Sequence, residues 1–325
     1  MYSYIVRRLL ILIPSLLITS FIVYALVNLI PGDIVDAIIS QGVDQNVDRA
    51  ALQKKYGLDA PLLVQYARWM GFAPQQDGKV SGIIQGDFGI SWWTHAEVLK
   101  AIATRWPVSF ELGLLALIIS QLIALPIGIL SSLRQDSWSD YLGRSFAILC
   151  LAMPSFWLGT MIIVYPSIWW GYMPSIIRIR FAEDPLGNLK MFIVPAIVLG
   201  MGMAGATMRM TRTMMLEVMR QDYIRTAWAK GLRERTITWR HALKNALIPV
   251  VTMIGLQAPV LIGGTVIIED IFVLPGMGRL VIEATFRRDQ QLLSGVVLLF
   301  ALALMLINLV VDLSYAALDP RVKYK

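Results

Sequence analysis

The chain has 325 residues, of which 57% are hydrophobic and only 16% are charged, and its formal net charge is +7. Soluble domains carry about 45–50% apolar and about 25% charged residues, so this composition excludes a typical soluble enzyme and a disordered chain. It indicates an all-α integral membrane protein, in which an excess of basic residues belongs to cytoplasmic loops rather than to a nucleic-acid site.

Six stretches without charged residues are long enough, or nearly so, to cross a bilayer as helices of about 20 residues. In chain order they are Leu9–Ile30, Leu112–Leu133, Ser145–Ile177, Met191–Met208, Asn245–Ile268 and Leu292–Val311. The first is too long for the apolar part of a typical signal peptide, so a membrane helix is predicted. The third is too long for one perpendicular helix, and its tail from Pro166 is expected to leave the membrane at an interface.

The loop after the first stretch is predicted to contain two short helices. One covers Arg49–Tyr56 and is ended by Gly57, and the other starts at Pro61, because proline suits the first helical turn. The second helix is expected to carry an apolar stripe at the helical spacing. The residues of this stripe are Leu62, Leu63, Tyr66 and Met70.

Lysine and arginine are unevenly distributed between the segments that connect the six stretches. If both termini are cytoplasmic, the inner segments hold 16 basic residues in 69 positions, and the outer segments hold 13 in 117. Basic residues are retained on the cytoplasmic side, so both termini are predicted to lie inside. The inner segments are 1–8, 134–144, 209–244 and 312–325.

This topology divides the chain into a cytoplasmic N-terminus with the first helix, an extracytoplasmic loop, a membrane core and a cytoplasmic tail. The corresponding ranges are 1–30, 31–106, 107–318 and 319–325. The core helices are expected at about 110–133, 145–168, 191–213, 247–268 and 292–314. The fourth reaches residue 213 only if Arg209 and Arg212 extend their side chains to the interface.

Motifs for chemistry are missing from the sequence. No G-x-x-x-x-G-K-[ST], H-E-x-x-H or C-x-x-C occurs, and with Cys150 as the one cysteine and only two histidines, no metal site, cofactor or catalytic site is expected. The apolar stretches also lack the carboxylates that a membrane enzyme or an ion-coupled carrier needs. The sequence therefore favours a non-enzymatic translocation channel that is powered by another protein.

The inner segment within 209–248 is basic and helix-prone. It reads R-T-A-W-A-K-G-L over 225–232 and R-H-A-L-K-N-A-L-I-P over 240–249. Ala227 and Gly231 are four residues apart, which predicts a small-residue face that approaches another surface closely. A solvated basic loop is the simpler alternative.

This segment resembles the ATPase-coupling loop of ABC-importer permeases. The general pattern of this loop is E-A-A-x-x-x-G followed by I-x-L-P, and the chain keeps Ala227, Gly231 and Leu243 of it. The positions where the chain departs from this pattern fit the variant found in the oligopeptide/dipeptide branch. Other motifs that resemble this branch are Ile30–Asp33, Tyr56–Pro61, Gly86–Ser91, Met153–Trp157, Glu269–Leu280, Asn308–Tyr315 and Leu318–Arg321. The long loop after the first span is similar to that of the B-type subunit.

The resemblance implies a type I ABC-importer permease with six helices, in the cell membrane of a bacterium or archaeon. The implied partners are a second homologous permease of the C type, two cytoplasmic ATPases that hold ATP and Mg, an extracytoplasmic solute-binding protein and the lipid bilayer, with no nucleic acid. Di- and oligopeptides are the implied substrates, and nickel chelates, glutathione and oligosaccharides are alternatives. A secondary carrier or a membrane scaffold is the alternative from another class.

The resemblance also assigns candidate residues. ATPase coupling is expected at Arg225, Ala227, Lys230, Gly231, Leu232, His241, Leu243 and Asn245. Outer-gate or binding-protein contacts are expected at Trp92, Trp93, Glu269 and Asp270. The structural alternatives are interfacial anchoring for the two tryptophans and pairing with Arg279 for the two acidic residues.

Overall fold

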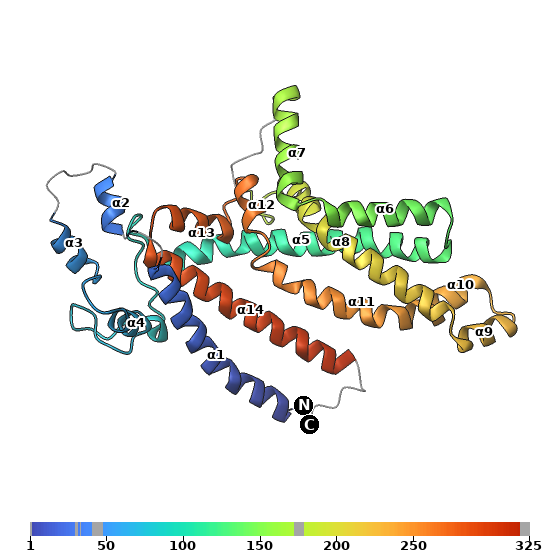
Figure 1. Cartoon of the computed structure of the whole chain (residues 1–325), viewed down its shortest axis with the longest axis horizontal. Coiled ribbons are helices and arrows are strands. Elements are labelled where there is room, and N and C mark those ends of the chain that lie inside the picture. Colours follow the sequence, from blue (N-terminus) through green and yellow to red (C-terminus); the bar gives the residue numbers. More distant parts are fainter. Residues whose placement is uncertain (1, 30–31, 33, 41–47, 172–178, 319–325) are drawn as a thin grey trace. The chain divides into compact units, whose positions relative to one another are not determined.

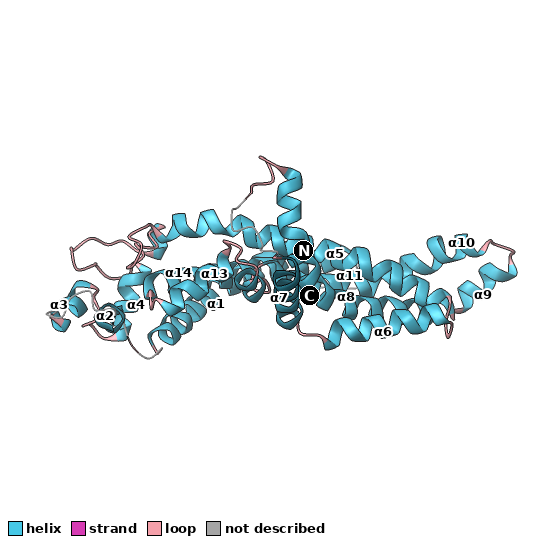
Figure 2. Ribbon diagram, turned by 90° about the horizontal axis from the view of Figure 1, so that it is seen from above, coloured by secondary structure: helices cyan, strands magenta, loops and turns pink. Residues whose placement is uncertain are grey.

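A computed structural model describes residues 2–29, 32, 34–40, 48–171 and 179–318. Within these ranges the protein is built from helices, and no strand occurs apart from a single bridge between Ile90 and Glu97 (Figure 2). The predicted all-α class is therefore confirmed.

The helices vary in length from single turns to elements that exceed a bilayer. The α-helices are α1 (Tyr2–Asn28), α2 (Ile34–Ser40), α3 (Arg49–Lys55), α4 (Leu62–Met70), α5 (Val98–Leu133), α6 (Trp138–Ala152), α7 (Ser155–Trp170), α8 (Pro185–Met219), α9 (Asp222–Ala229), α10 (Glu234–Thr236), α11 (Leu243–Gln257), α12 (Val266–Ile271), α13 (Met277–Phe286) and α14 (Gln290–Leu318). Short 3₁₀ turns cover Ile83–Gln85 and Ala258–Leu261, and a π-helix covers Ile237–Ala242.

Five helical segments are long and apolar enough to cross a membrane. They are Leu10–Asn28, Val98–Leu133, Pro185–Met219, Glu234–Leu261 and Gln290–Asp312. A sixth span results if α6 and α7, which meet at an angle of 92°, are taken as one broken span. Each of the six predicted stretches overlaps one of these segments.

The third stretch is bent where one continuous helix over about 145–168 was expected. Met153 is extended with ψ of 118°, and Pro154 follows it, so the α-helix stops at Ala152 and restarts at Ser155. Proline disfavours the helical conformation of the residue before it, which explains the position of the break. Pro166 lies inside α7, which ends at Trp170, so the helix continues through the segment where an exit at an interface was expected.

The fifth stretch is also interrupted, where one helix over 247–268 was expected. The α-helical part ends at Gln257, a 3₁₀ turn containing Pro259 follows, and α12 begins only at Val266. Two consecutive glycines, Gly263 and Gly264, occupy the connection. Glycine and proline both weaken a helix interior, so the local sequence explains this break.

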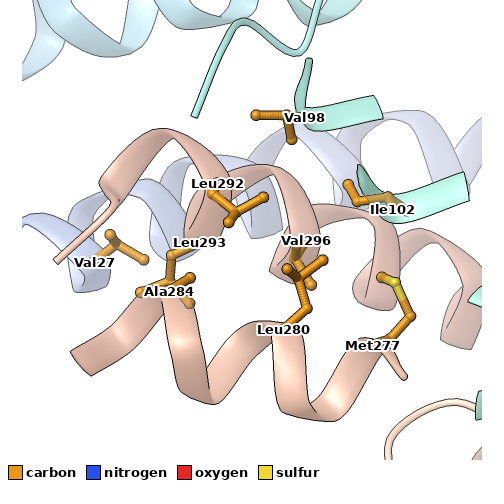
Figure 3. Close-up of a cluster of buried hydrophobic side chains, with 9 residues drawn as sticks. All are labelled: Val27, Val98, Ile102, Met277, Leu280, Ala284, Leu292, Leu293 and Val296. Carbon is orange, nitrogen blue, oxygen red and sulfur yellow. The ribbon is translucent and has the colours of Figure 1, made fainter. Parts of the chain in front are cut away.

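The chain forms two compact units, Met1–Val108 with Pro275–Leu306, and Ser109–Leu274 with Ile307–Lys325. The core of the first unit joins residues of α1, α5, α13 and α14 (Figure 3). Its members are Val27, Val98, Ile102, Met277, Leu280, Ala284, Leu292, Leu293 and Val296. The first turns of α5 therefore serve this unit, and α5 begins inside the range 31–106 that was expected to be loop.

The two predicted helices of the outer loop are present. Asp48 caps α3 by accepting a hydrogen bond from the Ala50 N–H at 2.9 Å, and α4 follows Pro61. The expected apolar stripe of α4 is wrong in part, because Leu62 and Leu63 are exposed while Trp69 and Met70 are buried.

The second unit contains α6, α8 and α11, which run side by side in Figure 1. Glycines allow close approach here. A Cβ on Gly200 would lie 2.7 Å from the Ala116 carbonyl oxygen on α5, and one on Gly205 would lie 2.8 Å from the Ala147 carbonyl oxygen on α6. Small residues at such contacts are typical of packed membrane helices.

Candidate functional site

The segment after α8 forms a compact helical turn. α9 begins after the extended Gln221 and ends at Lys230, and Gly231 adopts a left-handed conformation with φ of +74°. The Gly231 N–H donates to the Trp228 carbonyl at 2.9 Å, and the Leu232 N–H donates to the Ala227 carbonyl at 3.3 Å. This is the Schellman arrangement that closes a helix with glycine, so the local need for Gly231 is to end α9.

The chain then returns to the membrane core through an unusual helix. α10 leads into the π-helix Ile237–Ala242, which continues directly into α11. Ile237 and Ala242 are buried, whereas Trp239 is 58% exposed. π-Helical turns are rare and occur frequently at functional sites, which makes this segment a candidate in its own right.

The inner side of α9 packs against its own chain. Ile224 and Ala227 join a buried cluster with residues of α5, α8, the π-helix and α11. The further members are Ile129, Met215, Ile237, Ala242 and Ala246. The predicted small-residue face is therefore wrong for Ala227, which is only 8% exposed and is covered by this chain.

A polar contact fastens α9 to α11. The Asn245 Nδ2 donates to the Tyr223 hydroxyl oxygen at 2.7 Å, and the same nitrogen lies 3.4 Å from the His241 carbonyl oxygen. Tyr223 also reaches this carbonyl at 3.5 Å. Asn245 and the backbone of His241 thus hold the segment in place, and Leu243 lies at the edge of the buried cluster.

The outer side of α9 and the turn after it form an exposed surface that is both apolar and basic. Arg225, Lys230 and Leu232 are exposed. Trp228 was missed although it is 45% exposed. Position 228 lies four residues after the buried Ile224, so helical spacing predicts the same face for both, and only the structure shows that Trp228 is exposed.

A buried ion pair connects the N-terminal end of α6 with the C-terminal part of α8. Arg212 donates from Nε and Nη2 to the two carboxylate oxygens of Asp140, both at 2.7 Å. Ser131 and the Asp136 N–H also donate to this carboxylate, the latter at 3.0 Å. Arg212 was expected to extend to the interface, but its side chain is 19% exposed and its partner Asp140 is fully buried.

An uncharged polar cluster cross-links three helices inside the apolar stretches. The Gln257 Nε2 of α11 donates to the Thr207 hydroxyl at 3.1 Å and to the Met203 carbonyl at 3.2 Å on α8. The Gln121 Nε2 of α5 donates to the side-chain amide oxygen of Gln257, Oε1, at 3.3 Å. Interhelical bonds of this kind contribute about 0.6–2 kcal/mol each in membranes.

The outer candidates differ in their surroundings. The Trp93 indole N–H donates to the Arg287 carbonyl oxygen at 2.5 Å, which gives it a structural role. Trp92 packs on Tyr56, with ring centroids 5.2 Å apart, and lines a cavity. Glu269 is fully buried, so it is not a surface contact for a binding protein in this conformation, whereas Asp270 is exposed.

No group of three or more His, Cys, Asp or Glu side chains that could hold a metal ion occurs within the described ranges. Long apolar helices, interhelical amide contacts and a short basic helix between two spans together define a helical membrane protein.

Comparison with known proteins places the chain more narrowly. Two family models match it, the binding-protein-dependent transport system inner membrane component over residues 124–324 and its N-terminal part over residues 1–113. The chain belongs to this family, and it is a multi-pass permease component of a binding-protein-dependent ABC importer in the peptide/nickel branch. It is thus a transport subunit and not the ATPase.

Relatives match over the whole length of the chain. The glutathione transport system permease protein GsiC of Salmonella paratyphi A is 37% identical over 100% of both chains. A Brucella abortus protein, whose name describes a peptide transport system permease, is 38% identical over 100% of both. The inward-facing methionine ABC transporter MetNI shares the fold, with a TM-score of 0.54 and 15% identity over 68% of this chain and 97% of that one.

Proposed function

We propose that this chain is the B-type permease of an importer that carries di- and oligopeptides delivered by an extracytoplasmic binding protein. The observation that supports the substrate class is the set of full-length relatives named as peptide and glutathione transport permeases. Glutathione is itself a small peptide-like molecule, so one pathway chemistry fits both names. Nickel chelates and oligosaccharides remain alternative substrates, and the transport test below distinguishes them from peptides.

The importer is proposed to contain two permeases and two ATPases. The sequence has no phosphate-binding G-x-x-x-x-G-K-[ST] motif, so ATP and Mg belong to partner chains. A homologous C-type permease would complete the pathway, because one chain with about six spans supplies half of a two-permease channel.

The coupling segment within 209–248 is proposed to dock on an ATPase through its exposed side. Trp228, Leu232 and the basic residues Arg225 and Lys230 form this side, and aromatic and arginine side chains are the residue types that dominate docking energies. Ala227, Leu243, His241 and Asn245 would hold the segment rigid from behind. A rigid element can pass the ATPase motion to α8 and α11, which are continuous with it.

Both termini are proposed to be cytoplasmic, with residues 31–106 outside and the permease core over 107–318. The support is the higher density of lysine and arginine in the segments assigned to the inside. On the outer side, Trp92 and Asp270 remain as proposed contacts of the binding protein or the outer gate.

Reconstitution tests the proposal. The chain, co-expressed with the permease and ATPases encoded beside it, is placed in liposomes with the matching binding protein. Uptake of a labelled tripeptide should require ATP and the binding protein, and an unlabelled nickel chelate or oligosaccharide should not compete. Uptake of the chelate or oligosaccharide instead of the peptide would overturn the substrate class, and uptake without ATP would overturn the importer assignment.

A further inference from the structure

A cavity of about 340 Å³ lies wholly within the first unit, among residues of α1, α3, α4, α14 and the chain between Gln75 and Trp92. This volume falls near the lower end of the range for ligand sites, about 300–1,000 Å³. The cavity shares no residue with the coupling segment or with the amide cluster of the second unit. The cavity is therefore separate from both of these sites.

Aromatic rings form part of the cavity wall. Tyr24 packs on Trp69 with centroids 5.0 Å apart, and Tyr56 packs on Trp92 at 5.2 Å. Such faces are held rigid by their ring contacts, and they pack well against apolar side chains and planar groups of a ligand.

Four glutamines that line the cavity contribute side-chain hydrogen-bond acceptors. Each glutamine donates its side-chain N–H to a backbone carbonyl oxygen. Gln65 donates to Ala60 at 2.7 Å, and Gln75 donates to Ser81 at 2.8 Å. Gln76 donates to Lys54 at 2.7 Å, and Gln291 donates to Phe88 at 2.8 Å. These bonds fix which end of each amide is the nitrogen. In the described part of the chain no donor bonds to the four amide oxygens, which remain available to N–H groups of a ligand.

One side of the cavity carries a cation without an anionic partner. Arg68 is half-buried, and its guanidinium makes no hydrogen bond or ion pair within the described ranges. The nearby carboxylate of Asp87 is engaged by Ser81 and by the Gly89 N–H at 2.8 Å. The buried indole nitrogen of Trp69 also has no acceptor. A ligand carboxylate would satisfy the guanidinium of Arg68 with two parallel hydrogen bonds. A lysine ammonium at this position would not offer the same paired geometry.

We propose that this cavity binds a short peptide of two or three residues with a free C-terminal carboxylate, held by Arg68, while the glutamine oxygens accept hydrogen bonds from the peptide N–H groups. The inference rests on the proposed peptide substrate and adds a second peptide site, on the permease itself. An uncharged sugar would leave the guanidinium unpaired. A peptide matches the unpaired guanidinium, the acceptors and the aromatic wall together, and the second cation of the lining, Lys55, lies over the Tyr56 ring at 5.6 Å.

The test is calorimetric titration of the complete transporter in nanodiscs, without ATP or binding protein, with trialanine and with trialanine amide. The acid should bind about ten- to hundredfold more tightly than the amide, the range for a hydrogen bond to a charged group. Arg68→Gln should weaken binding of the acid by the same factor and leave the amide unchanged. The matched control is Arg49→Gln, because Arg49 pairs with Asp36 at 2.9 Å and does not line the cavity.

Three results would overturn the proposal. Equal affinity for the acid and the amide in the wild-type protein would remove the carboxylate argument without needing any variant. Absence of trialanine binding, in a transporter that still imports peptides with ATP and its binding protein, would reject the cavity site and leave the proposed function standing. If Arg68→Gln weakens only the complex with the binding protein, the cavity is a protein contact and not a peptide site.

Discussion

Replacing Asp140 by asparagine should destabilise the protein strongly, because Asp140 has no exposed surface and accepts hydrogen bonds from Arg212, Ser131 and the Asp136 N–H. The substitution keeps the size of the side chain but removes its charge and one of the two acceptors that face Arg212. Breaking a buried pair by removing one partner costs about 3–5 kcal/mol, because the remaining charge is left desolvated.

The structure supplies a matched control four residues away. Asp136 is also an aspartate, but its side chain is 64% exposed and its contact with Arg144 is a long one of 3.9 Å. Asp136→Asn should therefore change the stability by less than about 0.5 kcal/mol, as is usual for surface substitutions. The double variant Asp140→Asn with Arg212→Gln should be less destabilised than the sum of the two single variants, because it removes both partners of the 2.7 Å ion pair together; Arg144, at 3.5 Å from Asp140, loses its carboxylate in both the single and the double variant.

Thermal unfolding of the purified permease in detergent measures the effect. At about 2 °C per kcal/mol for a large domain, Asp140→Asn should lower Tm by about 6–10 °C, while Asp136→Asn leaves it within about 1 °C. Equal Tm values for the two variants would refute the reasoning that burial makes the Asp140 pair strong.

Three further predictions concern docking, local conformation and topology. Trp228→Ala should weaken ATPase docking by about 2 kcal/mol, roughly 30-fold, and lower stimulated ATP hydrolysis. The control Trp138→Ala removes another exposed tryptophan and should change neither quantity. Equal effects of the two variants would reject the docking surface. Gly231→Ala should cost about 1 kcal/mol in Tm measurements through its φ of +74° alone, since nothing lies within 4 Å of an added Cβ; no change in Tm would contradict the helix-ending role. Cysteines at Ser3 and Val80 in a cysteine-free background should label from opposite sides of the membrane, and external labelling of Ser3 in intact cells would overturn the inside assignment of the termini.

The two helix breaks show how far local sequence information extends. Pro154 and the Gly263-Gly264 pair mark the places where the third and fifth stretches change direction, and both signals are visible in the sequence. Hydropathy averaged over a span does not register them, since a bent span is as apolar as a straight one. The expected helices over 145–168 and 247–268 were wrong for this reason.

The coupling segment shows the limit for site residues. The motif located the segment, but it treated Ala227 and Gly231 as one docking face. The structure separates them, because Ala227 packs into a cluster with residues from α5, α8 and α11, while Gly231 ends α9 by its backbone conformation. Trp228, which the motif does not specify, is exposed beside them.

By itself the sequence determined the class of the protein, the positions of its apolar spans and the branch of permeases that it belongs to, because hydrophobicity and motif spacing are local properties of the chain. Only the tertiary structure decided which polar side chains find partners. Asp140 with Arg212, Gln121 with Gln257, and Tyr223 with Asn245 are separated by 72, 136 and 22 positions. Burial and pairing depend on which helices pack together, and no local pattern records that packing.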